Sequence, residues 1–313
     1  MTLRPDTRAL ALLGLVMVFW AGNSIVGRAV ADSIPPLTLA FMRWTGASLL
    51  LLPFAWTPLR RDLPVLRTQW KAVLLLGLLG IGAFNALLYS GLHYTTATNA
   101  LLLQAAVPAL VLVLDRMFYK VRAGGWQVAG TVASTLGVII VVFRADPALL
   151  AALHLGAGDA LVLASVVVWA LYTVFLRLRP QVSPVSFVAA TFAVGVVSMA
   201  PFAAWEFTRG LRIAWSTGTV LALAYVSVFP SLLSYFIYNA AAARLGAARA
   251  GQSITLLPIF GALLSAVLLG EALHWYHALG MAMIGAGIAM GLLALRRQQA
   301  GGAPAGAPLE GEG

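Results

Sequence analysis

The chain alternates between long apolar stretches and short polar breaks. Ten stretches of about 20 residues are almost continuously apolar, which is the length that an α-helix needs to cross a bilayer core of about 30 Å. They lie at residues 9–30, 36–56, 71–92, 96–115, 126–143, 157–178, 184–205, 217–240, 247–270 and 275–295. Strands of a membrane barrel would instead alternate apolar and polar positions over about ten residues. The pattern therefore predicts an all-α integral membrane protein with ten transmembrane helices.

Composition supports this class and excludes several others. Of the 313 residues, 61% are hydrophobic and only 10% are charged, whereas a soluble domain carries about 25% charged residues. A soluble enzyme, a nucleic-acid-binding protein and a disordered scaffold are thus excluded. The net charge of +10 comes from basic residues between the apolar stretches, which is typical of membrane topology and not of phosphate recognition. The chain has no cysteine, so disulfides and thiolate metal sites are absent.

The basic residues also predict the orientation of the helices. If the N-terminus is cytoplasmic, fifteen of the 20 Lys and Arg residues fall in cytoplasmic segments and four fall outside. This bias follows the positive-inside rule and places both termini in the cytoplasm. The first apolar stretch is too long for the apolar part of a cleaved signal peptide. Residues 297–313 are rich in Gly, Ala and Pro and are expected to form a disordered tail.

The two halves of the chain align with each other almost without gaps. Rare residue types recur at a spacing of 149 or 150. The matched pairs are Trp20 and Trp169, Arg28 and Arg177, Pro35 and Pro184, Trp56 and Trp205, Tyr89 and Tyr238, Pro108 and Pro258, Gly130 and Gly280, and Gly137 and Gly287. The predicted organisation is an N-terminus (1–8), a first repeat (9–143), a linker (144–156), a second repeat (157–296) and a tail (297–313).

Each predicted repeat holds five helices, an odd number. The second repeat must then cross the membrane in the opposite sense to the first. Inverted repeats of this kind are typical of secondary transporters, whose substrate site lies near the bilayer midplane between the halves. The repeat is the strongest indication of function in the residue pattern.

Several of these residues resemble those of a known family. Phe19-Trp20 and Arg28 in the first stretch, with Pro35 and Arg43 leading into the second, resemble the drug/metabolite transporter superfamily. Pro108 in the fourth stretch, and Pro258 followed by Gly270-Glu271 in the ninth, are similar to its EamA-type branch. Within that branch, the YddG-type amino-acid exporters of bacterial inner membranes are the nearest subgroup. Many relatives carry lysine where this chain has Arg28, so no role for that charge is inherited.

Arg43 is the most unusual residue in the predicted spans. It lies about seven residues into the second stretch, and no Asp or Glu lies in the middle of any stretch. Charged groups inside a membrane are costly and are functional candidates. Two interpretations remain open: Arg43 binds backbone carbonyls and organises the bundle, or it contacts a carboxylate of the substrate.

Other polar and aromatic residues fall on shared helix faces. Trp20 and Asn23, for example, lie at i and i+3 of the first stretch. Two symmetric sets of aromatic and neutral hydrogen-bonding groups suit a partly apolar organic solute better than an inorganic ion. The candidate cavity residues are Trp20, Asn23, Arg43, Asn85, Tyr89, Asn99, Gln104, Trp169, Tyr172, Ser234, Tyr235, Tyr238, Gln252 and Ser253. The alternative is that these groups only join helices to one another.

Proline and glycine positions add a mechanical hypothesis. Pro108 and Pro258 lie within matching stretches, where each is expected to kink its helix and serve either as a hinge for gating or as a static bend. Gly287 and Gly291 form a G-x-x-x-G pattern, which favours close helix packing within the bundle over dimerisation.

Catalytic and metal-binding motifs are missing from the sequence. Glu271, His274 and His277 spread over about 120° of a helix face, which does not favour a metal site. A phosphate-binding Walker motif is absent, and no cofactor is expected. The predicted function is a secondary transporter, not an enzyme, that exports amino acids or similar small metabolites across a bacterial inner membrane, as a monomer or homodimer. The alternatives are a drug or nucleotide-sugar transporter of the same superfamily and a non-transporting membrane enzyme or assembly factor.

Overall fold

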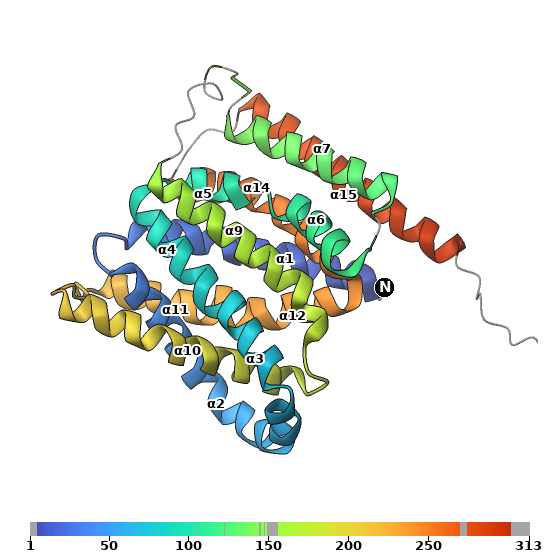
Figure 1. Ribbon diagram of the computed structural model, residues 1–313. Helices are drawn as coiled ribbons and strands as arrows, with labels where there is room; N and C mark the ends of the chain where they lie inside the picture. The colour runs from blue at the N-terminus through green and yellow to red at the C-terminus, as the bar shows by residue number, and fades with distance from the viewer. Residues whose placement is uncertain are drawn as a thin grey trace, which may run out of the picture.

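The computed structural model is a bundle of helices (Figure 1). It describes residues 5–104, 106–121, 123–143, 145–146, 148, 156–269 and 274–301. No strand occurs in these ranges, so the all-α prediction is confirmed for the described part of the chain.

In the first half the helices are α1 (Pro5–Ala29), α2 (Pro36–Thr68), α3 (Trp70–Gly77), α4 (Phe84–Tyr94), α5 (Ala97–Gln104), α6 (Val107–Tyr119) and α7 (Gly125–Val142). In the second half they are α9 (Ala157–Phe175), α10 (Pro184–Thr208), α11 (Thr217–Ser227), α12 (Ser234–Leu245), α13 (Ala247–Gln252), α14 (Leu257–Leu269) and α15 (Trp275–Gly301).

Six helical stretches of the described chain are long and apolar enough to cross a membrane. They are Thr7–Ala29, Pro36–Thr68, Trp70–Tyr94, Ala157–Leu178, Pro184–Thr208 and Thr217–Leu245. Each of them overlaps one of the ten predicted windows. The windows 96–115 and 247–270 contain shorter helices with breaks between them, and the window 126–143 contains a shorter apolar helix, Gly125–Ile140. The window 275–295 lies within α15.

Helix α2 is longer than its apolar stretch predicts. The sequence indicates an end near residue 56 and a break from Pro58 to Arg67, but the helix continues to Thr68 through Pro53, Pro58 and Pro64. The prediction of a break was wrong because hydropathy locates the membrane edge and not the helix end. A helix satisfies most of its own backbone hydrogen bonds and can extend beyond the apolar layer.

Two of the long stretches are interrupted by π-helical turns. One turn, η1 (Leu78–Ala83), joins α3 to α4, and the other, η3 (Val228–Leu233), joins α11 to α12. The two turns lie 150 residues apart, within one residue of the spacing of 149 that relates Tyr89 to Tyr238 in the sequence repeat. A π-turn shifts the register of the backbone hydrogen bonds and often occurs at functional sites. Both turns contribute backbone carbonyls to the centre of the bundle.

Helices α2 and α10 are held together by a carboxylate at each end of the pair. Glu206, near the end of α10, accepts hydrogen bonds from the backbone nitrogens of Leu37 (3.0 Å) and Thr38 (2.7 Å) at the start of α2. Asp62, near the end of α2, accepts a hydrogen bond from the backbone nitrogen of Ser183 (2.9 Å), which precedes α10. The two helices are therefore antiparallel, and each carboxylate binds the positively polarised N-terminus of its neighbour.

Helices α7 and α15 run side by side at one edge of the bundle (Figure 1). Their backbones meet at glycines: a Cβ atom built on Gly137 would lie 2.7 Å from the carbonyl oxygen of Gly280. A Cβ atom on Gly287 would collide with Ser134 Oγ and the carbonyl oxygen of Gly130. Gly287 of the G-x-x-x-G pattern thus packs against another helix of the same chain, as the sequence favoured.

This contact predicts a difference between two neighbouring glycines of α15. Gly287→Ala is expected to lower the stability by about 1–3 kcal/mol because the new methyl group overpacks the α7 interface. Gly285→Ala is the matched control, since nothing lies within 4 Å of a Cβ atom there. That control is expected to keep or raise the stability, because alanine favours a helix over glycine. Thermal unfolding of both variants in detergent measures the difference, and equal melting temperatures would contradict the packing described here.

Candidate functional site

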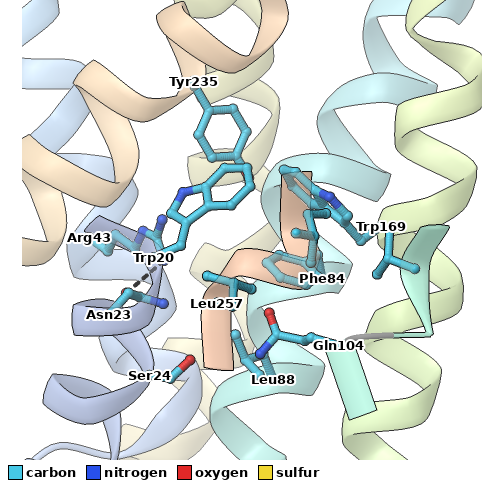
Figure 2. A pocket seen from close by; sticks show the side chains of 12 residues that line it. Trp20, Asn23, Ser24, Arg43, Phe84, Leu88, Gln104, Trp169, Tyr235 and Leu257 are labelled. Carbon is cyan, nitrogen blue, oxygen red and sulfur yellow. Dashed lines mark hydrogen bonds between the residues drawn. The ribbon is translucent and has the colours of Figure 1, made fainter. Parts of the chain in front are cut away.

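A cavity at the centre of the bundle is lined by side chains from nine helices and turns. It is small: the free space measures about 20 Å³, which is room for about one water molecule. Arg43 and Asn23 lie on one side of it, and Trp169 and Phe84 lie on the other (Figure 2). The lining residues are Trp20, Asn23, Ser24, Arg43, Phe84, Leu88, Gln104, Val107, Trp169, Tyr235, Ile254 and Leu257.

Arg43 lies at the wall of this central cavity and is almost completely buried, with 2% of its surface exposed. One end of its guanidinium group, Nη1, donates to Asn23 Oδ1 (3.1 Å), Asn85 Oδ1 (2.7 Å) and Tyr89 Oη (2.8 Å). Tyr89 in turn donates to Asn23 Oδ1 at 2.7 Å. These contacts connect α2 to α1 and α4 within the first half of the chain.

The remaining guanidinium nitrogens of Arg43 bind the π-turn η3 of the second half. Nε donates to Ser231 Oγ at 2.5 Å, and Nη2 donates to the carbonyl oxygen of Pro230 at 2.9 Å. The same carbonyl accepts a hydrogen bond from Trp20 Nε1 at 3.0 Å. The Pro230 carbonyl is free to accept these hydrogen bonds because the π-turn displaces backbone acceptors from their usual helical partners. Arg43 therefore joins both halves of the chain at the cavity wall.

Every one of these acceptors is electrically neutral. Within the described residues the ion pairs join Arg61 to Asp62 and Arg177 to Asp115, and neither includes Arg43. The ring of Trp44 adds a cation–π contact, with Arg43 Cζ 4.6 Å from its centroid. Hydrogen bonds to neutral groups reduce the cost of burying the charge, but they do not neutralise it. The cavity wall thus carries a positive charge that can attract an anionic group.

Aromatic rings form most of the rest of the site. Trp20 and Trp169 meet edge to face with centroids 4.9 Å apart, and Phe84 lies 4.7 Å from Trp169. Tyr172 and Tyr238 flank Trp169 at 5.0 Å and 5.3 Å. We call these five residues the aromatic cluster. Edge-to-face and tilted rings of this kind pack firmly and offer an apolar surface to a ligand.

The tyrosine hydroxyls of the second half have hydrogen-bond partners, whereas one indole N–H of the site has none. Tyr172 donates to Asn239 Oδ1 at 2.8 Å, and the Tyr238 hydroxyl lies 3.0 Å from Thr173 Oγ1. Tyr235 donates to the carbonyl oxygen of Gly80 in η1. The buried indole nitrogen of Trp169 has no hydrogen-bond partner among the described residues. An orphan donor beside a cavity is costly unless a ligand or water accepts from it.

The structure brings together most of the candidate residues and places others elsewhere. Six of them line the central cavity: Trp20, Asn23, Arg43, Gln104, Trp169 and Tyr235. Asn85 and Tyr89 bind Arg43, and Tyr172 and Tyr238 belong to the aromatic cluster. Ser234 donates to the carbonyl oxygen of Phe229 in the preceding turn. The side chain of Asn99 lies outside the described residues.

Gln252 and Ser253 belong to a different region. Gln252 Nε2 donates to the carbonyl oxygen of Gly287 in α15 at 3.0 Å, and Ser253 Oγ donates to that of Ala250 at 2.6 Å. Both line a separate pocket with Arg249 and not the central cavity. Their side chains join α13 and its following turn to α15 and to the local backbone.

Pro108 and Pro258 occupy equivalent places after breaks in their helices. Pro108 is the second residue of α6, which follows the end of α5 at Gln104. Pro258 is the second residue of α14, which follows a 3₁₀ turn, η4 (Ser253–Leu256). A proline fits the first turn of a helix because the nitrogen there has no helical partner. Each of the two stretches is therefore divided into shorter helices at its proline.

Several residues of the central cavity had little or no signal in the sequence. Phe84, Leu88, Val107, Ile254 and Leu257 line the cavity, but apolar residues are not distinctive in a chain of this composition. The carbonyl of Pro230 is an acceptor only because of the local π-turn. The described residues contain no group of three His, Asp or Glu side chains placed to hold a metal ion. Glu271 lies outside the described residues, and the Nδ1 atom of His277 accepts from the backbone nitrogen of His274.

Two larger hollows lie near opposite ends of α9. The first, of about 330 Å³, is lined by residues at the ends of α9 and α12, and we call it the basic vestibule. The residues that define it are Thr173, Val174, Leu176, Arg177, Arg179, Gln181, Asn239, Ala242, Ala243 and Gly246. The second, of about 470 Å³, is the mixed vestibule. It is lined by Ala31, Asp32, Ser33, Ile34, Pro35, Pro36, Leu37, Ser90, His93, Tyr94, Trp205, Glu206, Leu211 and Arg212.

Known proteins resemble this chain along most of its length. An uncharacterized transporter from Archaeoglobus fulgidus is 28% identical over 88% of this chain and 94% of its own. A protein from Salmonella typhimurium named a probable amino-acid metabolite efflux pump is 27% identical over 90% of this chain and 94% of its own. A solved structure described as the crystal structure of a protein has the same fold, with a TM-score of 0.70, 18% identity and coverage of 94% of this chain and 99% of its own.

The family comparison covers both halves of the chain. The EamA-like transporter family matches residues 7–143 and again residues 156–293. This result confirms the resemblance carried by the Trp, Pro and Arg positions of the sequence, and it agrees with the apolar helices of the structure. The chain is a multi-pass membrane transporter and belongs to the EamA-like transporter family of the drug/metabolite transporter superfamily.

Proposed function

We propose that this protein is a secondary transporter that moves amino acids or similar small metabolites by alternating access. The observation that carries the proposal is the small central cavity, with a positive charge on its wall and a larger vestibule toward either end of α9. A channel would need a continuous path between the vestibules. An alternating-access transporter instead opens its central site to one side at a time.

The topology that we propose has ten spans in two inverted repeats of five. The two family matches, the paired π-turns and the paired breaks at Pro108 and Pro258 all support it. The excess of Lys and Arg on one side supports cytoplasmic termini. With this orientation the basic vestibule faces the cytoplasm and the mixed vestibule faces outward, in a bacterial inner membrane.

The chemistry of the cavity supports an amino acid as the substrate. The Arg43 guanidinium group lacks a carboxylate partner among the described residues, so a substrate carboxylate fits beside it. The aromatic cluster suits an apolar side chain of the substrate. The indole N–H of Trp169 has no acceptor among the described residues and is therefore available to donate to the substrate. The name of the Salmonella relative supports the same class of substrate.

The size of the cavity requires the helices to move during transport. A space of about 20 Å³ cannot hold an amino acid, so the cavity must expand when substrate binds. The breaks at Pro108 and Pro258 are the places where α6 and α14 can change direction with the least loss of backbone hydrogen bonds. We propose that these two prolines are the hinges of the transport cycle.

Transport by the purified protein tests the proposed function. Proteoliposomes are expected to take up labelled leucine, methionine and phenylalanine with saturable kinetics and mutual competition. Repeating the assay with and without a pH gradient determines whether protons are coupled to transport. Competition by nucleotide sugars or cationic drugs, without uptake of amino acids, would favour the other branches of the superfamily. Absence of any solute flux from folded protein would contradict a transport function.

Substitution of Arg43 tests its contact with the substrate. Arg43→Gln is expected to lower the stability by roughly 2–4 kcal/mol, because buried acceptors on α1, α4 and η3 lose their donor. The same variant is also expected to bind leucine at least tenfold more weakly. The rise in melting temperature on adding leucine, recorded at a slow heating rate, measures this affinity.

Arg67→Gln is the control for this experiment. Arg67 lies on the same helix, α2, but is exposed, so its loss is expected to change stability by less than about 0.5 kcal/mol. An Arg43→Gln protein that melts lower but binds leucine with unchanged affinity would contradict the substrate contact. It would leave Arg43 as a residue that only organises the bundle.

A further inference from the structure

The basic vestibule differs in charge from the mixed vestibule, although the sequence repeat relates the two. At a spacing of 149 residues, Ser90 and Tyr94 of the mixed vestibule correspond to Asn239 and Ala243 of the basic one. The two hollows lie near opposite ends of α9, which is about 28 Å long. Equivalent positions in the two repeats thus form the two ends of the proposed transport path.

Among the described residues, no acidic side chain lines the basic vestibule. Its charged lining residues are Arg177 and Arg179, whereas the mixed vestibule is lined by Asp32 and Glu206 as well as Arg212. A concave surface of one charge sign concentrates oppositely charged solutes. An anionic solute is therefore favoured in the basic vestibule, and the mixed vestibule lacks this excess of positive charge.

The two arginines of the basic vestibule are not equally available. Arg177 Nη2 contacts Asp115 at 2.5 Å, and its Cζ atom lies 3.9 Å from the ring centroid of Tyr119. Arg179 is half-buried, and its guanidinium group makes neither a hydrogen bond nor an ion pair with any residue that the structure describes. Arg179 is accordingly the cation that can bind a ligand without breaking an existing contact.

A buried amide supplies a second unused donor. Asn239 is 5% exposed, and its Nδ2 atom has no hydrogen-bond partner in the part of the chain that the structure describes. Tyr172 donates to Asn239 Oδ1, and this contact directs the amide group so that its nitrogen is the free end. Tyr172 also belongs to the aromatic cluster of the central cavity. Asn239 therefore lies between the basic vestibule and the central site.

The rule that places positive charge in the cytoplasm explains why arginines occur at this end of the bundle. It does not require a hollow lined by them, nor a buried amide beside it with an unused donor. We propose that the basic vestibule binds the carboxylate of the solute, through Arg179 and Asn239 Nδ2, before the solute moves to the central cavity. This assignment rests on the proposed function, which supplies a carboxylate-bearing substrate.

The absence of cysteine from the sequence allows a direct test of the charge in each vestibule. Ala243→Cys places a single thiol in the basic vestibule at an exposed position, and Tyr94→Cys does the same in the mixed vestibule. The ratio of reaction rates with an anionic and a cationic methanethiosulfonate reagent reports the local potential. The ratio is expected to be at least about threefold higher at Ala243→Cys, in nanodiscs of phosphatidylcholine.

Substituting single arginines identifies which residue produces the positive potential in the basic vestibule. Arg179→Gln is expected to lower the ratio at Ala243→Cys by at least threefold, whereas Arg67→Gln, which removes an exposed charge outside the vestibule, leaves it unchanged. Equal effects of the two substitutions would overturn the proposal. The positive potential would then come from all the basic residues at this end of the bundle and not from Arg179 in the vestibule. Melting temperatures of the variants confirm that each protein is folded during labelling.

Protection of the same thiol tests carboxylate binding without any transport assay. Isovalerate is expected to slow the alkylation of Ala243→Cys by a neutral maleimide, and the neutral isostere isovaleramide is not. The protection is expected to disappear in Arg179→Gln. Equal protection by the two compounds, or none, would overturn the proposal.

Two further comparisons complete the test. The first distinguishes binding of a carboxylate from binding of a lipid phosphate, and the second distinguishes failure of the vestibule site from failure of the proposed transport function. If nanodiscs of phosphatidylglycerol protect the thiol as isovalerate does, a lipid phosphate occupies the vestibule and the proposal fails. Failure of leucine uptake with intact protection by isovalerate would overturn the proposed function and not the vestibule site. Intact uptake without protection would overturn the vestibule site alone.

Discussion

The burial of one guanidinium group beside neutral acceptors is the constraint on which the centre of this protein depends. Arg43 donates to α1, α4 and the π-turn η3 at once, so four separate segments, α2 included, must hold their positions to satisfy it. A charge in a membrane interior is costly without such partners. The helices around Arg43 are therefore coupled: a change in the position of one of them alters the hydrogen bonds of the others.

This coupling gives a physical basis for linking substrate binding to helix movement. The acceptors of Arg43 come from both halves of the chain, and under the proposed function a substrate carboxylate would compete with those neutral acceptors for the same N–H groups. Binding of the carboxylate would then weaken the contacts between halves at the place where the cavity must open. The breaks at Pro108 and Pro258 and the two π-turns provide segments that can bend without unfolding a continuous helix.

The sequence was most informative where residue type and position were both unusual. Arg43, Trp20 and Trp169 are conspicuous in apolar stretches, and all three line the central cavity. Gln252 and Ser253 were equally conspicuous, but they bind backbone carbonyls elsewhere, because a polar residue in an apolar helix serves packing as readily as ligand binding. The carbonyl of Pro230 could not be predicted, since it depends on a π-turn that has no residue signature. The length of α2 was also missed, because hydropathy does not report where a helix ends in water.

The central claim is that the two vestibules open alternately to the small central cavity, and distances between spin labels test it most directly. One pair, Tyr94→Cys with Trp205→Cys, spans the mixed vestibule, and another, Leu178→Cys with Ala243→Cys, reports the end of the bundle with the basic vestibule. Double electron–electron resonance with and without leucine measures both distance distributions in the same nanodiscs. We expect leucine to change the two distances in opposite directions, one end closing as the other opens. Simultaneous widening of both ends, or no change at either end in protein that binds leucine, would contradict alternating access.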